Sequence, residues 1–282
     1  MGYAQVETDI VRVDSSIVVL NATIRDSQDR PVTGLHQADF KILEDGVLQR
    51  IKLFESNEAP FSAIVLFDTS GSMAERISLA RSATINFLDG LRGDDMTAIY
   101  RFDSKVEMVQ DFSDSRDVSD KIFDLRASGQ TVLNDAIYGA ALALDKRPER
   151  RKAIIVLSDG ADTFSKYSAE KALKAALAAN VTIYTVDMSN IDTGGHERSQ
   201  NQSVLKNFAE KTGGFFIPTD NGRSFRDALK SVVDELRIQY TLAYEPVNLR
   251  SDGRWHDLEI RVARPNLTIR TRRGFNAPSG KR

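Results

Sequence analysis

The stretch from Ala63 to Met73 constrains the fold most, because an apolar run leads directly into a polar loop. It reads A-I-V-L-F-D-T-S-G-S-M. A continuous apolar run bounded by turn residues predicts a strand buried on both faces, as in a parallel sheet. Apolar residues then recur at intervals of three and four from Ile77 to Leu91, which indicates a helix. We therefore expect a strand–loop–helix unit with polar side chains at the carboxyl end of the strand, where open α/β sheets place ligands.

Three oxygen-bearing side chains, Asp68, Ser70 and Ser72, follow this strand at intervals of two residues. They can converge on one point from a tight loop, and a donor set without sulfur or imidazole favours a hard divalent ion. A helix cap explains the same residues: Ser70 or Ser72 would cap the helix, and Asp68 would be favourable near its positive end. The spacing alone does not decide between the two interpretations.

Three separate segments resemble the von Willebrand factor type A (VWA) domain. D-T-S-G-S at 68–72 resembles the Asp-x-Ser-x-Ser signature that opens its metal-ion-dependent adhesion site (MIDAS). Thr131, in S-G-Q-T-V-L-N-D-A, resembles the MIDAS threonine, and Asp159, in A-I-I-V-L-S-D-G-A-D, resembles the MIDAS aspartate. The matches follow the family's order, and the resemblance covers about residues 61–240.

The resemblance implies a role for each matched residue. Ser70, Ser72 and Thr131 would offer hydroxyl oxygens to Mg²⁺ (or Mn²⁺ or Ca²⁺), and Asp68 and Asp159 would bind it directly or through water. In the family, an Asp or Glu carboxylate of a partner protein fills the remaining coordination position. The resemblance thus predicts a metal-dependent, adhesion-type binding module and not an enzyme.

Strands and helices alternate between residues 61 and 238, which predicts a doubly wound, mostly parallel sheet with helices on both faces. We expect helices at 116–126 and 202–211, among others, and a polar loop at 189–201 that contributes to specificity. Asp162, Thr163 and Asp187 are predicted close to the site. Asp162 is a solvated loop charge or a rim residue, Thr163 a turn residue, and Asp187 a rim residue or a cap.

The flanking segments 8–55 and 239–275 have β patterns instead, with a hairpin predicted on Asp45-Gly46. Two short sheets with one apolar face each need a partner. We therefore expect one β-sandwich module built from both termini, with boundaries at 1–60, 61–238 and 239–282. In its last strand, Arg270 and Arg272 are interpreted as a solvated face, or alternatively as a small anion site.

These flanks also resemble a bacterial VWA-related family, through P-V-x-G-L-x-x-x-D-F-x-x-x-E-D-G at 31–46 and Q-Y-x-L-x-Y-x-P at 239–246. Members of that family are usually predicted to be exported. The start of this chain has neither a basic n-region nor an apolar h-region. The expectation is therefore an extracytoplasmic protein whose leader is absent from this chain.

Charge, hydropathy and histidine spacing narrow the possible functions of the chain. A formal charge of −2 gives no electrostatic argument for nucleic acid, and no apolar run is long enough to span a membrane. The histidines, His36, His196 and His256, have no ligand spacing and are interpreted as surface or loop residues. Two other functions stay open: a structural or assembly subunit with a stabilising metal, and a metal-assisted hydrolase or phosphotransferase. The lack of a general base beside the motif argues against the hydrolase or phosphotransferase.

Overall fold

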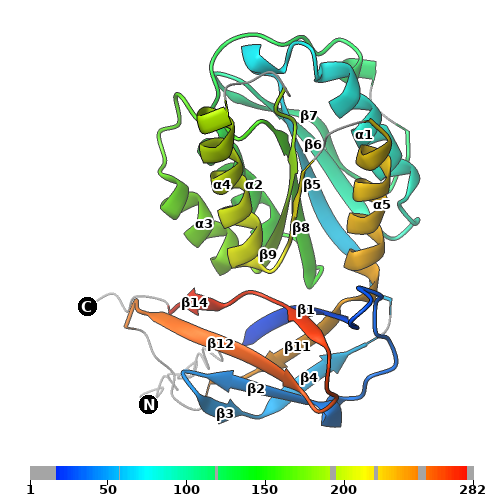
Figure 1. The fold of residues 1–282 in the computed structure, drawn as a ribbon, viewed down its shortest axis with the longest axis vertical. Helices are drawn as coiled ribbons and strands as arrows, with labels where there is room; N and C mark the ends of the chain where they lie inside the picture. The colour runs from blue at the N-terminus through cyan, green and yellow to red at the C-terminus, as the bar shows by residue number, and fades with distance from the viewer. Residues whose placement is uncertain are drawn as a thin grey trace, which may run out of the picture.

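The computed structural model describes the following residues: 17–56, 58–117, 120–190, 195–218, 222–246 and 252–277. Figure 1 shows an α/β part with a smaller β part against one end of it. No helix within these ranges is long and apolar enough to cross a membrane.

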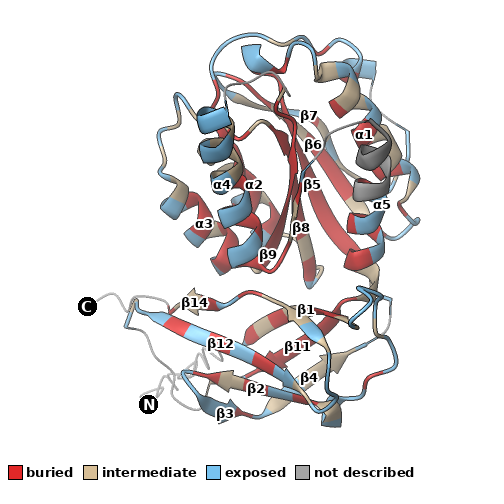
Figure 2. Ribbon diagram, in the orientation of Figure 1, coloured by how far each residue is buried: buried red, intermediate tan, exposed pale blue. Residues whose placement is uncertain are grey.

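The α/β part is built on a six-stranded sheet in the order β10-β9-β8-β5-β6-β7, in which only β7 is antiparallel to its neighbour. Its strands are β5 (Phe61–Asp68), β6 (Met96–Phe102), β7 (Val106–Ser113), β8 (Arg151–Ser158), β9 (Val181–Asp187) and β10 (Phe216–Ile217). All eight residues of β5 are buried, as expected for a central strand covered on both faces. Figure 2 shows this burial along the middle of the sheet.

Helices cover both faces of this sheet (Figure 1). They are α1 (Ile77–Asp89), α2 (Leu133–Asp145), α3 (Ala169–Ala178), α4 (Gly195–Thr212) and α5 (Gly222–Ile238). Phe87 of α1 and Val232 of α5 belong to one apolar cluster, while Ile137 of α2 and Phe208 of α4 belong to the other. The prediction of a doubly wound, mostly parallel sheet is confirmed.

Two local predictions are wrong. Where a helix was expected at 116–126, the structure has a single 3-10 turn at Asp120–Ile122. Residues 118 and 119 of that range lie outside the described residues. The helix expected at 202–211 begins at Gly195, so half of the predicted polar loop 189–201 is helical, and 191–194 lie outside the described residues. The first helical turns of α4 are polar and exposed, so they carry no apolar periodicity to reveal them.

The β part consists of two four-stranded sheets, ordered β13-β1-β11-β4 and β14-β12-β2-β3. Its strands are β1 (Val18–Arg25), β2 (Phe40–Glu44), β3 (Val47–Gln49), β4 (Ile51–Glu55), β11 (Tyr240–Tyr244), β12 (Trp255–Val262), β13 (Thr268–Arg270) and β14 (Gly274–Asn276). Each sheet joins strands from both ends of the chain, and both contribute to one apolar core. The sandwich expected from the two termini is therefore present. Residues 8–16 of the predicted first strand lie outside the described residues. The domain boundaries stay a prediction.

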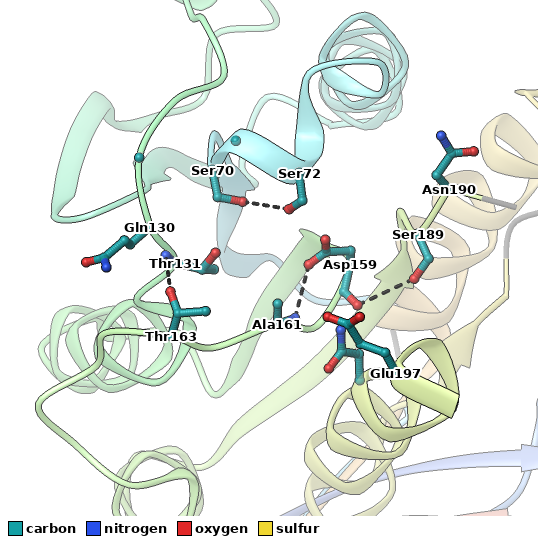
Figure 3. Close-up of a pocket in the computed structure, with 13 residues that line it drawn as sticks. Ser70, Ser72, Gln130, Thr131, Asp159, Ala161, Thr163, Ser189, Asn190 and Glu197 are labelled. Carbon is teal, nitrogen blue, oxygen red and sulfur yellow. Dashed lines mark hydrogen bonds between the residues drawn. The ribbon is translucent and has the colours of Figure 1, made fainter. Parts of the chain in front are cut away.

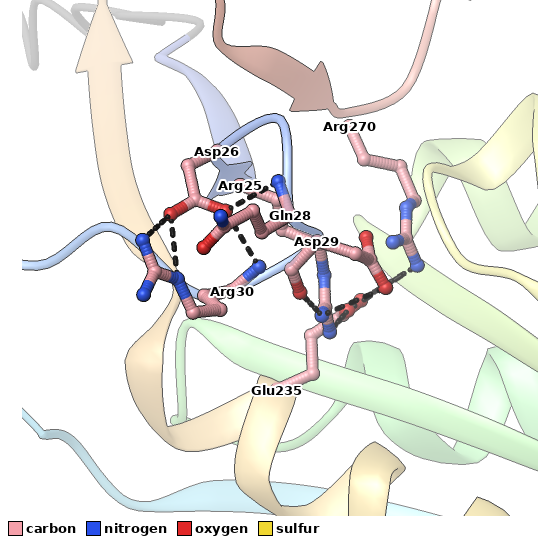
Figure 4. Close-up of polar contacts among 7 residues, drawn as sticks. All are labelled: Arg25, Asp26, Gln28, Asp29, Arg30, Glu235 and Arg270. Carbon is pink, nitrogen blue, oxygen red and sulfur yellow. Dashed lines mark hydrogen bonds and ion pairs between the residues drawn. The ribbon is translucent and has the colours of Figure 1, made fainter.

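Buried charged groups join the two parts, and Figure 4 shows one such cluster around Glu235 of α5. Its fully buried carboxylate accepts hydrogen bonds from Arg25 (3.2 Å) and Arg270 (3.2 Å) of the β part, and from the Tyr184 hydroxyl (3.2 Å) of β9. Burial raises the pKa of Glu235, and the two arginines oppose that shift. A desolvated carboxylate with these partners favours one arrangement of the two parts.

The interpretation of Arg270 and Arg272 as a solvated face is therefore wrong, and both serve the junction. Arg272 is 8% exposed, and it donates to the carbonyls of Leu177 (2.9 Å) and Val19 (2.7 Å), one in each part. The interpretation failed because Arg270 reaches Glu235 of α5, and Arg272, which follows β13, reaches a carbonyl of α3.

Arg151, at the start of β8, holds the connection between α5 and β11. Its buried guanidinium donates to the carbonyls of Leu236 (3.2 Å), Arg237 (2.7 Å) and Gln239 (2.6 Å). Burial lowers the pKa of Arg151 to about 10, so the side chain stays cationic at neutral pH. Cations suit a helix carboxyl end, where carbonyl groups lack helical partners.

Replacing Arg151 by methionine should lower the free energy of unfolding by about 3 kcal/mol, because buried carbonyls lose their donors. The neighbouring Arg150 is exposed and pairs with Glu55, so Arg150→Met should cost less than about 1 kcal/mol. Urea denaturation followed by circular dichroism measures both variants. Equal losses in the two variants would contradict the role given to Arg151.

Candidate functional site

The carboxyl ends of β5, β8 and β9 meet at one edge of the sheet. Phe67 pairs with Leu157, so the residues that follow them, Asp68 and Ser158, are also neighbours. Ser158 in turn pairs with Asp187 at the end of β9. Parallel pairing in this register places the polar ends of three strands in one row.

Asp68 lies beneath the loop that follows β5 and is fully buried. Its Oδ1 accepts a hydrogen bond from the Ser70 amide (2.8 Å), and its Oδ2 accepts one from the Ser158 hydroxyl (2.5 Å). Burial raises the pKa of Asp68 to about 7, although the hydrogen bonds from Ser158 and Ser70 oppose the shift. The carboxylate thereby ties the loop after β5 to the end of β8.

Backbone hydrogen bonds fasten the three predicted site loops to one another. The Gly71 amide donates to the Gly129 carbonyl (3.2 Å), which links the loop after β5 to the loop before α2. The Thr163 amide donates to the Thr131 carbonyl (3.0 Å), and the Thr131 amide donates back to the Thr163 hydroxyl (3.0 Å). Gly129 has a φ of +78°, a conformation that glycine adopts without strain.

Four of the five predicted residues, Ser70, Ser72, Thr131 and Asp159, line one pocket of about 380 Å³, and Asp68 lies directly below it. Figure 3 shows the two serines, Thr131 and Asp159 converging from three loops. The lining also includes backbone and small or polar side chains: Gly71, Gly129, Gln130, Ala161, Thr163, Ser189, Asn190, Glu197 and Asn201. The structure therefore brings together the residues that are separated along the chain.

The oxygen atoms of these side chains suit a hard cation better than a helix cap. The Ser70 and Ser72 hydroxyl oxygens are 3.2 Å apart, close to the roughly 2.9 Å between adjacent ligands of octahedral Mg²⁺. Within the described part of the chain, Thr131 Oγ1 and Asp159 Oδ2 have no hydrogen-bond partner. Ser70 precedes the 3-10 turn Gly71–Met73, and its side chain makes no capping hydrogen bond. The pocket thus offers oxygen atoms that internal contacts leave unused.

Residues beside the predicted set support the loops. Asp162 is not a solvated charge: its Oδ2 accepts from the Asn134 amide (2.8 Å) and the Ser165 hydroxyl (2.7 Å), and it caps α2 from outside the helix. Asp187 is fully buried and accepts from the amide (2.9 Å) and hydroxyl (2.5 Å) of Ser189, so it acts as a cap rather than at the rim. Thr163 holds the Thr131 backbone and lines the pocket.

Sequence reasoning missed two residues at this site. Ser158 is the last residue of β8, and its bond to Asp68 depends on the strand register, which no local pattern reports. Glu197 lines the pocket from the first turn of α4, a segment that was predicted to be a loop. The position of Ser158 was a signal that could have identified it as a site residue, because it directly precedes Asp159 at the end of an apolar strand.

Comparisons with known proteins agree with this geometry. A family profile described as the von Willebrand factor type A domain matches residues 63–161, which include all five predicted site residues. The central part of the chain is therefore similar to a von Willebrand factor type A domain. A search of curated proteins returned no significant match.

Solved structures show the same fold at low sequence identity. A von Willebrand factor type A protein from Catenulispora acidiphila is 13% identical, with a TM-score of 0.52 over 96% of this chain and 76% of its own. The vWF domain of the type V pili tip protein Mfa5 from Porphyromonas gingivalis is 13% identical, with a TM-score of 0.52 over 63% of this chain and 95% of its own. An aerotolerance-related membrane protein from Bacteroides fragilis is 20% identical, with a TM-score of 0.50 over 62% and 99%.

The cap provided by Asp162 gives a stability prediction. Asp162→Ala should lower the free energy of unfolding by about 1–2 kcal/mol, because the Asn134 amide at the start of α2 loses its acceptor. Asp162→Asn keeps an acceptor oxygen and should cost less. Thermal unfolding of the two variants makes the comparison, and a larger loss for asparagine than for alanine would count against the cap.

Proposed function

We propose that this protein is a metal-dependent binding module that captures an acidic side chain of a partner protein at the pocket formed by the three loops. Ser70, Ser72 and Thr131 would hold a divalent cation, Mg²⁺ in the first place and Mn²⁺ or Ca²⁺ as substitutes. Asp68 and Asp159 would orient these hydroxyls and contribute charge. The bound cation would supply an electrophilic centre for a partner's carboxylate.

One observation carries this proposal: oxygen atoms from three loops face one pocket, and two of them, Thr131 Oγ1 and Asp159 Oδ2, have no hydrogen-bond partner among the described residues. Among the described residues, the lining contains two carboxylates, those of Asp159 and Glu197, and no Lys or Arg side chain. A pocket of that charge attracts a cation before it can accept an anionic group.

The comparisons support a protein-interaction role at a coarser level. VWA domains commonly bind a divalent metal, and the similar structures include the pili tip protein from Porphyromonas gingivalis. We extend this to an extracytoplasmic location and a protein ligand for this chain. The resemblance favours that binding role over catalysis.

Titration with Mg²⁺ or Mn²⁺ should reveal one site per chain, because a single pocket gathers the predicted ligands. Asp159→Asn and Ser70→Ala should each weaken binding by at least about 10-fold. Isothermal titration calorimetry on the full chain measures this change.

Two matched controls use exposed positions of α1 that do not line the pocket. Asp89→Asn and Ser78→Ala remove a carboxylate and a hydroxyl of the same kinds, and both should bind Mn²⁺ as the original chain does. Unchanged Mn²⁺ affinity in Asp159→Asn and Ser70→Ala would remove these residues from the site.

The capture of a carboxylate should be visible with Mn²⁺ as the probe. A Mn²⁺ ion held by few protein ligands keeps exchangeable water and enhances water proton relaxation. A glutamate-containing peptide should reduce that enhancement by replacing water, whereas the same peptide with glutamine should have no effect. Relaxation measurements at increasing peptide concentration test this.

The relaxation measurement and an assay of phosphoester turnover separate the two alternatives from the binding role. An ion with closed protein coordination would show little relaxation enhancement and no peptide effect, which would favour a structural or assembly role. A metal-assisted hydrolase would turn over phosphoesters in the presence of Mg²⁺ or Mn²⁺, and such turnover, lost in Asp159→Asn, would replace the binding proposal.

A further inference from the structure

A second group of metal-ligating side chains lies in the β part, remote from the pocket. Glu44 ends β2, Asp45 occupies the hairpin turn that follows it, and His256 lies on the neighbouring strand β12. One potential ligand atom from each lies within 4.8 Å of the other two. We propose that these three residues form a binding site for a divalent transition-metal ion of the Zn²⁺ type.

His256 is the central residue of this group. The interpretation of His256 as a surface or loop residue is wrong, because its side chain is 2% exposed and packs against the Phe275 ring (5.5 Å between centroids). Its Nδ1 lies 2.8 Å from Asp45 Oδ2 and 3.7 Å from Glu44 Oε1. A tetrahedral zinc site places adjacent ligand atoms roughly 3.3 Å apart, and the two observed distances lie on either side of that value.

A third carboxylate, that of Asp252, lies beside the other ring nitrogen of His256, Nε2. Asp252 Oδ1 lies 3.4 Å from His256 Nε2. When the ring is neutral with its proton on Nε2, it donates to Asp252 and turns the Nδ1 lone pair toward Glu44 and Asp45. Metal-binding histidines commonly have such a carboxylate on the second nitrogen, which fixes the tautomer and the ring orientation.

The two carboxylates are also oriented by donors on their outer oxygens. Glu44 Oε2 accepts from the buried Tyr244 hydroxyl (2.7 Å), and Asp45 Oδ1 accepts from the Asp257 amide (3.0 Å). In each case the other oxygen faces His256 Nδ1. One oxygen of each side chain is thus directed toward the imidazole, and the outer donors hold both carboxylates in place.

The local charge favours a cation near these groups. Three carboxylates surround one imidazole, so a protonated ring still leaves a formal excess of two negative charges. The buried Arg272 guanidinium donates to carbonyl groups of Leu177 and Val19 and not to these carboxylates. Either a proton or a metal ion lies between Nδ1 and the carboxylates, and the mixed nitrogen–oxygen donor set suits Zn²⁺.

The chemistry separates this site from the pocket. An imidazole with carboxylates favours Zn²⁺, whereas an oxygen-only set suits Mg²⁺. Asp45 is 33% exposed, so water can reach the site and complete the coordination. The bound ion would join the β2–β3 turn to β12, and would therefore stabilise the sandwich when Zn²⁺ is present.

Zn²⁺ titration of the full chain in excess Mg²⁺ tests the proposal, with a chromophoric chelator as competitor. We expect one Zn²⁺ per chain, lost in His256→Gln and weakened 10- to 100-fold in Asp252→Asn. His36→Gln and His196→Gln remove the other two histidines of the chain and should leave the affinity unchanged. Asp159→Asn should also bind Zn²⁺ normally, so the result is independent of the pocket.

A measurement on the unaltered chain keeps the test valid if His256→Gln does not fold. Only three histidines contribute imidazole signals to a ¹H–¹⁵N spectrum, and the His36 and His196 variants assign them. Zn²⁺ should shift the His256 Nδ1 resonance alone. Zn²⁺ binding that survives in His256→Gln, a shift confined to another histidine, or the absence of saturable Zn²⁺ binding would each overturn the proposal.

Discussion

The hydrogen bond between the Ser158 hydroxyl and the buried Asp68 carboxylate is the contact on which the pocket depends. Burying a carboxylate away from solvent costs several kcal/mol unless donors surround it, and Asp68 receives one donor from the loop after β5 and one from the end of β8. Its position is set by the parallel pairing of β5 and β8, which is itself stabilised by apolar burial on both faces of the sheet. The apolar core therefore determines where the polar edge forms, and Asp68 fixes the loop after β5 to that edge.

The β part packs at the opposite end of the same sheet (Figure 1). Arg151 begins β8 and binds the end of α5, whereas Ser158 ends β8 at the pocket. The arginines that contact Glu235 also come from strands near this junction. Because the junction and the pocket occupy opposite ends of the strands, attachment of the β part leaves the lining of the pocket uncovered by it.

The sequence predicted what depends on local periodicity and on side-chain chemistry. The apolar run before Asp68 indicated a buried strand, and the residues at 68–72, 131 and 159 indicated a shared edge, which the structure shows. It did not predict contacts that arise from register or from packing between parts. Ser158 reaches Asp68 only through strand pairing, and Arg272, which follows β13, is buried between the two parts, where it donates to a carbonyl of each. Neither fact has a signature within a few residues of sequence.

His256 shows the same limit most clearly. Asp45 and His256 are 211 residues apart, yet the pairing of β2 with β12 sets them side by side. Ligand spacing along the chain cannot reveal a site whose members meet through antiparallel pairing of distant strands. Bringing Asp45 and His256 together closes a loop of 211 residues, which costs conformational entropy. These contacts alone do not have to offset that cost, because the α/β part folds between the two segments and brings their ends together. The polar cluster on β12 therefore depends on the same central sheet that positions Asp68, although the two groups share no residue and differ in donor chemistry.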